Sequence, residues 1–350
     1  MKKWVIAAFS AILLLSACSQ TSQNKEPVKQ QKQAVKAEKK SGASDAFPYY
    51  YPLTGKGSEK KTDGRAIAVM INNHPKARPQ SGLQKADIVY ELLAEGDITR
   101  FLAVYQSEMP DKFGPIRSAR GYFVELAKGL DALYIAHGYS PEAKEMLDSG
   151  YVDNLNGMVY DGTLFQRASF RKAPHNSYIT YKNILKGVKE KNYSMAKSPP
   201  AFTFLSEGES KKIQGDPALS ATVSYFSNNQ FKAVYQYDAQ LGKYKRFSGG
   251  EQTVDLDTKE PVLLDNVFII EAVHQTVDSV GHRKIDLQSG GNGYLLQKGK
   301  VNLVEWKNSN GRIIPVKNGK EVPFVQGKTW VNVVPATPGL QKSVSFTENK

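Results

Sequence analysis

Apolar and polar positions divide the chain into four stretches of different texture. The first is an almost wholly apolar run from Trp4 to Ala17, preceded by Lys2 and Lys3. Lysines, a short apolar run and small residues before a cleavage point are typical of a secretory signal peptide. The run has about 14 residues, whereas a membrane-spanning helix needs roughly 20. We therefore predict a lipoprotein signal peptide at residues 1–17.

The second stretch, residues 18–47, is rich in Lys, Gln, Ser and Ala and poor in large apolar residues. It cannot bury enough surface to fold, so we predict a flexible tether. It begins after Leu15-Ser16-Ala17-Cys18, which fits the bacterial lipobox, in which the Cys sulfur carries a diacylglycerol. Two acyl chains hold a protein stably on a bilayer. We expect the chain to be anchored to the cell membrane through lipid on Cys18, on the extracytoplasmic face.

The third stretch, residues 48–197, alternates between strand and helix patterns. Short buried runs predict strands, and amphipathic runs behind the capping residues Ser118, Ser140 and Thr180 predict helices. The expected strands are 67–71, 88–93, 101–105 and 133–136, and the expected helices are 118–130, 140–150 and 180–191. This order is typical of an α/β domain, a layered sheet with helices.

The fourth stretch, residues 198–350, loses the helical period. Short apolar runs are separated by turn signals such as Gly249-Gly250, Lys298-Gly299 and Asn318-Gly319. The expected strands are 222–226, 233–237, 267–273, 284–287, 293–296, 301–306 and 330–334. We predict a mainly antiparallel β domain after the α/β domain.

Charge and cysteine usage narrow the function. The formal net charge is +13, which favours anionic partners such as a cell-wall polymer or an acidic glycan, although scattered solvated lysines explain part of it. No nucleic-acid recognition motif is present, so we expect no nucleic-acid partner. Cys18 is the one cysteine, and its lipidation would leave no disulfide and no thiol nucleophile. No metal-ligand spacing is present, and no cofactor is predicted.

Arginine is concentrated in the α/β stretch, where seven of the ten arginines lie between Arg65 and Arg171. Arg117 and Arg120 stand beside an expected helix start, where free backbone N–H groups and the helix dipole favour anions. Arginine binds phosphate and carboxylate groups in bidentate fashion. The alternative is that these two arginines form salt bridges with the acidic residues Glu91, Glu95, Asp97 or Glu125.

A second loop, Phe165–Tyr178, carries Arg167, Arg171, His175 and Asn176. Loops on a rigid scaffold often hold sites, although Pro174 and Asn176 could simply shape a turn here. His137 follows a buried strand, at the end where open α/β sheets place their sites. His137 and His175 are therefore candidate acid and base residues, and structural hydrogen bonding is the alternative for each.

Several segments together resemble a known family. They are Pro52-Leu53-Thr54-Gly55, the run from Asn72 to Glu91, Thr99–Gln106, Gly114–Arg120, Ala173–Tyr178, Ser289–Leu296 and Lys328–Pro335. On these segments the chain resembles the YerB-type bacterial lipoproteins, the domain-of-unknown-function 3048 family, which has an N-terminal and a C-terminal part. The resemblance implies a surface lipoprotein, mostly of Gram-positive bacteria, and brings no established reaction.

We expect a binding function for the α/β domain. An Arg-rich cleft would hold an anionic or glycan component of the cell envelope. The charge would come from Arg100, Arg117, Arg120, Arg167 and Arg171, and hydrogen bonds from His175 and Asn176. One alternative is an envelope enzyme acting on phosphodiester or glycosidic bonds, with His137 or His175 as acid or base. Another is a non-catalytic scaffold that recruits a membrane partner through the β domain.

Overall fold

One mixed sheet of twelve strands organises the chain, and strands from both ends of the sequence pair within it. The computed structural model describes residues 47–226, 228–279 and 281–347. Along the sheet the order is β23-β22-β21-β20-β17-β24-β4-β5-β3-β7-β8, and β11 pairs with β21. The bounds are β3 Ile67–Asn72, β4 Ile88–Glu95, β5 Ile98–Tyr105, β7 Leu133–Ala136, β8 Asn154–Asn156, β11 Asp216–Pro217, β17 Asn266–Ala272, β20 Gly291–Gln297, β21 Lys300–Ser309, β22 Arg312–Lys317, β23 Lys320–Glu321 and β24 Thr329–Pro335.

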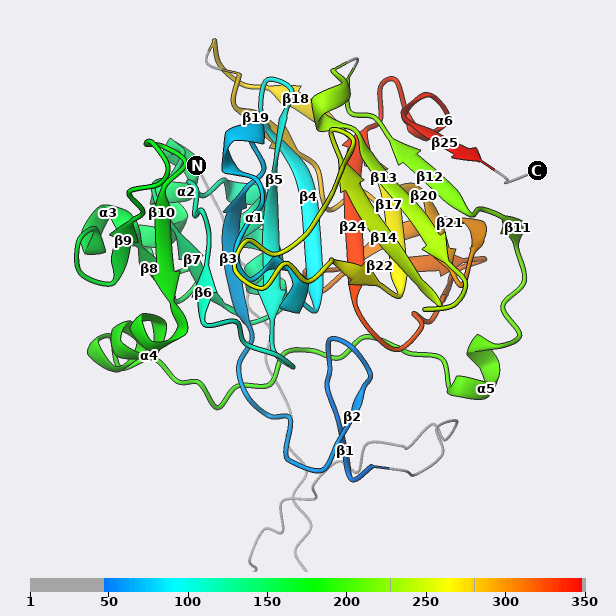
Figure 1. The fold of residues 1–350 in the computed structure, drawn as a ribbon, viewed down its shortest axis with the longest axis horizontal. Coiled ribbons are helices and arrows are strands. Elements are labelled where there is room, and N and C mark those ends of the chain that lie inside the picture. Colours follow the sequence, from blue (N-terminus) through cyan, green and yellow to red (C-terminus); the bar gives the residue numbers. More distant parts are fainter. Residues whose placement is uncertain (1–46, 227, 280, 348–350) are drawn as a thin grey trace, which may run out of the picture. The chain divides into compact units, whose positions relative to one another are not determined.

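Six of these strands run in the same direction. Strand β7 is parallel to β3 and β8, and β24 is parallel to β4 and β17. Strand β5 is antiparallel to both β3 and β4, so the two parallel groups share one orientation. The C-terminal ends of β8, β7, β3, β4, β24 and β17 therefore meet at one edge of the sheet. We call it the carboxyl edge; it is uppermost in Figure 1.

Smaller sheets accompany the large one. A six-stranded sheet contains β12 Ser220–Val223, β13 Ala233–Asp238, β14 Lys243–Ser248, β15 Glu251–Gln252, β16 Leu263–Leu264 and β25 Val344–Thr347. A three-stranded sheet contains β6 Lys112–Phe113, β9 Phe165–Arg167 and β10 Ser177–Thr180. Two further pairs are β1 Tyr49–Tyr50 with β2 Gly57–Ser58, and β18 His274–Thr276 with β19 Arg283–Ile285.

The helices are short, and the longer ones follow strands of the first half. They are α1 Gly121–Gly129, α2 Pro141–Asp148, α3 Gly157–Tyr160, α4 Tyr181–Glu190, α5 Glu207–Ser210 and α6 Leu340–Ser343, with 3₁₀ turns at Pro75–Ala77, Leu83–Lys85 and Asn229–Phe231. Two expected caps are confirmed, because the Ser140 side chain accepts from the Ala143 N–H and Thr180 accepts from the Asn183 N–H. The expected Ser118 cap is wrong: α1 begins at Gly121. The Ser118 hydroxyl instead donates to the backbone oxygen of His137 at 3.2 Å.

Alternating side chains give the large sheet two buried faces. On β17, Val267 and Ile269 lie on one face and Phe268 and Ile270 on the other. The Val267 face packs against the six-stranded sheet, which appears in front of β17 and β24 in Figure 1, and against α4. The Phe268 face packs against α1 and α2. The large sheet is therefore covered on both sides, which suits the almost continuous apolar runs of its parallel strands.

The structure is mostly β. Helices of eight or more residues occur, within the described ranges, only between Gly121 and Glu190. Because β24 pairs with β4, one sheet crosses the expected boundary near residue 198, so the division into an α/β domain and a β domain stays a prediction. None of the helices in the described part of the chain is long and apolar enough to cross a membrane. The predicted signal peptide, Cys18 and the tether up to residue 46 lie outside the described residues.

Candidate functional site

The two arginine-bearing loops meet at the carboxyl edge, beside the ends of β3 and β7. The Ile116 N–H donates to the backbone oxygen of Ser177 at 2.7 Å, which joins the segment after β6 to the start of β10. Arg117 Nη1 approaches the backbone oxygen of Pro174 at 3.5 Å. The loops that sequence alone could not place together are therefore neighbours.

Arg171 holds this region together. Its guanidinium donates to the backbone oxygens of Ala77 at 2.8 Å and Pro79 at 2.6 Å, and to the Tyr178 hydroxyl at 2.7 Å. These bonds tie the second arginine loop to the turn that follows β3. Arg171 thus stabilises the loop, and its guanidinium donors are already used in hydrogen bonds within the protein.

Two imidazole rings stack at the end of β3. The ring centroids of His74 and His175 are 4.5 Å apart, with an interplanar angle of 26°. Asn72 Oδ1 accepts from the His74 backbone N–H at 2.9 Å, so Asn72 Nδ2 donates to His175 Nδ1, also at 2.9 Å. His74 Nδ1 accepts from the Lys76 backbone N–H at 3.1 Å. Each neutral ring therefore carries its proton on Nε2, and neither Nε2 has a protein partner among the described residues.

The surroundings keep these imidazoles neutral at pH 7. Burial is the largest cause that lowers the pKa of His74 and His175 from 6.5, followed by the charge of Lys76 for His74 and by its neighbour His74 for His175. The charge of Arg117 lowers both pKa values further. Two neutral N–H donors beside a guanidinium form a group of donors suited to an oxyanion.

Arg117 differs from Arg100, Arg120 and Arg167, each of which forms an ion pair with a carboxylate. It is half-buried and makes no ion pair with a carboxylate within the described part of the chain. Burial, and then the charge of Arg100, lower its pKa to about 10, so it stays charged at pH 7.

Arg100 and Arg120 lie beneath this surface, 2% and 3% exposed. Both pair with Glu95 at the end of β4, Arg100 at 2.6 Å. Arg120 therefore forms a salt bridge with Glu95, which is the alternative to anion binding that the sequence left open. The start of α1 also has an internal carboxylate nearby, because Glu142 Oε2 lies 2.8 Å from where a Cβ on Gly121 would be. Glu95 is thus in direct contact with both guanidinium groups, and the charge of Asp278 also acts on Arg120.

His137 has internal partners on both ring nitrogens. Arg167 Nη2 lies 2.8 Å from Nε2, and Ser177 Oγ lies 2.7 Å from Nδ1. A guanidinium can only donate, so Nε2 is unprotonated and Nδ1–H donates to Ser177. His137 therefore cannot take a proton from Ser177, whose residue is 1% exposed. The pair does not have the arrangement of a nucleophile and its base.

Arg167 is the most exposed of the candidate cations. It forms an ion pair with Asp161 at 2.9 Å and approaches Asn176 Oδ1 at 3.3 Å. We call the group His74, Arg117, His137, Arg167 and His175 the His–Arg cluster. Within the described residues, no group of three or more His, Cys, Asp or Glu side chains could hold a metal ion.

Sequence reasoning missed a buried polar network behind the cluster. Glu91 on β4 is fully buried and accepts from Arg246 Nη2 at 2.9 Å and from Trp330 Nε1 at 3.0 Å. Arg246 also lies over the Trp330 ring, 4.4 Å from its centroid. Arg78 and Arg246 both line a hollow of about 70 Å³. Glu91 and Arg246 are 155 positions apart, so no local pattern could have paired them.

Comparison with known proteins places these residues in a family. A model described as the N-terminal domain of a protein of unknown function, DUF3048, matches residues 53–194, and the model of the C-terminal domain matches residues 221–331. The YerB protein of Bacillus subtilis (strain 168), which is named as a lipoprotein, is 47% identical over 339 residues, 96% of each chain. A crystal structure of YerB from Bacillus subtilis is 48% identical, has a TM-score of 0.79 and covers 85% of this chain and 99% of that chain.

Proposed function

The chain belongs to the DUF3048 family of proteins of unknown function, and we propose that it is a lipid-anchored protein that binds an anionic component of the cell envelope. The lipobox ending at Cys18 and the name of the YerB relative support the anchor. The His–Arg cluster is the proposed binding surface, on the extracytoplasmic face. Metabolic labelling with a radioactive fatty acid tests the anchor: the starting protein should carry the label, the Cys18→Ala protein should lose it, and an unlabelled starting protein would contradict lipidation.

One observation carries the binding proposal: Arg117 is a charged side chain without a carboxylate partner in the described structure, next to two N–H donors that have no protein acceptor. A phosphate or carboxylate group on a polymer could accept from Arg117 and from the Nε2 atoms of His74 and His175. Hydrogen bonds to a charged group contribute more than neutral ones. The same three groups are therefore the proposed contacts.

The other expected residues support this surface in different ways. Arg100 and Arg120 lie below the surface, where Glu95 contacts both and the charge of Asp278 also acts on Arg120. Arg167 contributes an exposed guanidinium, which also forms an ion pair with Asp161. Arg171 holds the loop, and Asn176 stands at its end beside Arg167. Long-range charge of this kind raises the local concentration of an anionic polymer.

Isothermal titration calorimetry with a purified, phosphodiester-linked wall polymer tests the proposal. Arg117→Gln removes the charge and keeps a polar side chain of similar reach. We expect the affinity to fall by about tenfold or more, since a hydrogen bond to a charged group contributes roughly 1.5–3 kcal/mol.

Arg312→Gln is the matched control, because it removes the same charge from β22, outside the His–Arg cluster. Its affinity should stay within about twofold of the starting protein, as expected for a distant screened charge. If both variants lose affinity equally, the polymer responds to net charge alone and the proposed site is wrong.

A further inference from the structure

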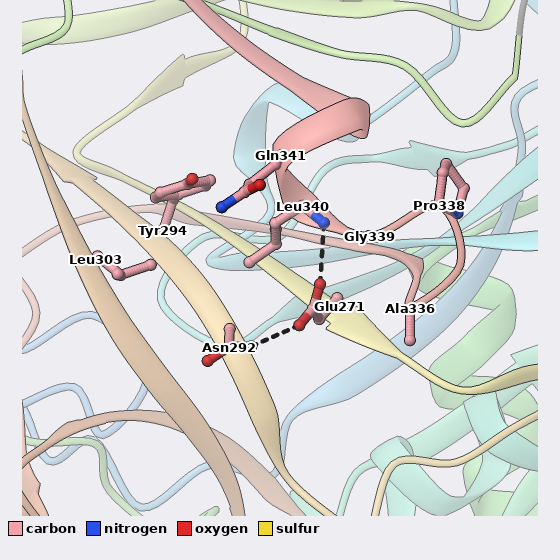
Figure 2. Close-up of a pocket in the computed structure, with 9 residues that line it drawn as sticks. All are labelled: Glu271, Asn292, Tyr294, Leu303, Ala336, Pro338, Gly339, Leu340 and Gln341. Carbon is pink, nitrogen blue, oxygen red and sulfur yellow. Dashed lines mark hydrogen bonds between the residues drawn. The ribbon is translucent and has the colours of Figure 1, made fainter.

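A second hollow opens at the other end of the carboxyl edge, where β17 and β24 finish. It has a volume of about 410 Å³, and the residues that line it include Glu271, Asn292, Tyr294, Leu303, Pro338 and Leu340. We call it the Glu271 hollow (Figure 2). Its size falls in the range of small-molecule sites, and its place at the ends of parallel strands is where α/β sheets bind ligands.

The Glu271 carboxylate is held in a fixed orientation. One oxygen accepts from the Leu340 backbone N–H at 2.9 Å and the other from Asn292 Nδ2 at 2.7 Å, as Figure 2 shows. The backbone oxygen of Glu271 accepts from Trp306 Nε1 at 2.8 Å. Gly339 has a φ of +87°, and a Cβ there would lie 3.2 Å from the carboxylate, so glycine permits the close approach of the turn before α6. The carboxylate therefore needs no reorganisation to receive a ligand.

The charge on Glu271 is not compensated. Both of its protein donors are neutral, and no ion pair joins it to a cation among the described residues. The lining residues include no Lys, Arg or His. A carboxylate accepts about four hydrogen bonds, so acceptor sites remain for a further donor. A positively charged donor would also neutralise the group.

The walls of the hollow are partly apolar. Tyr294 and Leu303 lie on one side of the carboxylate in Figure 2, and Ala336 and Pro338 on the other. Leu303 is 61% exposed, which is unusual for a large aliphatic side chain. The Tyr294 ring, held at 90° against Phe346 of β25, offers a face that attracts cations. The walls of the hollow thus suit the apolar body of a ligand, and the Glu271 carboxylate suits its positive charge.

We propose that the Glu271 hollow is a binding site for an organic cation, an ammonium or guanidinium group on an apolar body. This site is independent of the His–Arg cluster and takes a ligand of opposite charge. Glu271 binds the charged group, Tyr294 lies against it, and Leu303 and Pro338 contact the apolar body.

Fluorescence anisotropy with dansylcadaverine tests the proposal, because this probe joins a primary ammonium to an aromatic body. Its N-acetyl derivative, which is neutral, is the paired probe. The starting protein should bind the ammonium probe about tenfold or more tightly than the acetylated one, as a charge-assisted contact requires. Glu271→Gln, whose amide oxygen can still accept from Leu340, should abolish that preference.

Two further variants make the outcome decisive. Glu59→Gln removes an exposed carboxylate just after β2 that does not line the hollow, and it should keep the full preference. Leu303→Ala should weaken both probes alike, since it shortens an apolar wall and leaves the charge. Equal binding of the two probes to the starting protein, or no binding of either, would overturn the proposal. So would a preference that survives Glu271→Gln.

Discussion

The two ends of the carboxyl edge carry opposite chemistry on one sheet. At the ends of β3 and β7, guanidinium groups and neutral imidazoles gather around Arg117. At the ends of β17 and β24, a single carboxylate, Glu271, stands among aromatic and aliphatic side chains. The chain has a net charge of +13, yet this second region lines its hollow with no cation. Net charge therefore bears on long-range attraction, whereas each proposed site depends on its own group without an ion-pair partner.

The two regions also differ in how the charge is held. Glu95 compensates two buried guanidinium groups with one carboxylate, so the cationic region depends on an ion pair below its surface. Glu271 is held by neutral donors from Leu340 and Asn292. A change to the Glu95 ion pair should thus lower the stability of the fold. A change to the neutral donors of Glu271 should affect mainly ligand binding.

The largest expected effect comes from removing the shared carboxylate of the cationic region. Glu95→Gln leaves the side chains of Arg100 and Arg120, 3% and 4% exposed, without a carboxylate. Because an unpaired buried charge is costly, we expect the free energy of unfolding to fall by about 3 kcal/mol in urea denaturation. Asp161→Asn breaks the exposed ion pair with Arg167 and should cost less than about 1 kcal/mol. Equal losses in the two variants would show that burial of the pair makes no difference.

Acid should destabilise the region beside the Glu271 hollow through His274. Burial lowers the pKa of His274 from 6.5 to about 4, and its Nδ1–H donates to the Ala272 oxygen at 2.8 Å. As the pH falls below 6.5, the unfolded chain takes up the proton first, so stability is lost until the pH reaches about 4. The loss from this residue is at most about 3 kcal/mol.

Differential denaturation between pH 7 and pH 4 isolates that contribution. His274→Asn does not titrate and can keep a donor toward Ala272, so its stability should fall less with acid than that of the starting protein. Gln275→Asn, which changes an exposed and non-titrating neighbour on β18, is the control and should keep the original slope. Parallel pH profiles for all three proteins would exclude His274 as the cause.

The smallest expected effect separates the two sites by their pH dependence. A bound phosphodiester favours the imidazolium forms of His74 and His175, whose pKa values are lowered in the free protein. Polymer affinity should therefore rise a few-fold, less than about tenfold, as the pH falls from 8 to 6. Dansylcadaverine affinity should stay constant over the same range, since no imidazole lines the Glu271 hollow. Calorimetry and anisotropy at each pH measure both, and a common pH trend would argue against separate sites.

Local sequence patterns predicted most of the strands and several boundaries. The runs at 67–71 and 133–136 became β3 and β7 with little change, and Asn318-Gly319 forms the tight turn before β23. Ser118 misled the helix assignment because serine caps helices and also bonds to backbone oxygens elsewhere. Its hydroxyl donates to the His137 carbonyl oxygen, and Arg120 rather than Ser118 is the N-cap residue of the helix.

Residue types in the sequence were enough to choose candidate residues, but not to predict the partners of those residues. Arg117 and His175 were identified from two loops whose meeting depends on the pairing of β6 with β10. Arg120 and Glu95 are separated by 25 positions, and Arg246 and Glu91 by 155, so only the folded sheet brings them together. Glu271 had one local signal, a charged residue near the end of the apolar run Asn266–Ala272, and that pattern alone does not reveal a hollow.

Strand β24 lies between β4 and β17 in the sheet and follows both of them in the sequence. A polypeptide threaded through a membrane from its amino end would present the bare edges of β4 and β17 until residue 329 emerged. Unpaired strand edges invite association with other chains. We therefore expect the large sheet to be completed in one late step, when β24 pairs with β4 and β17. Protease resistance in export-arrested chains should appear only after Pro335 has crossed the membrane.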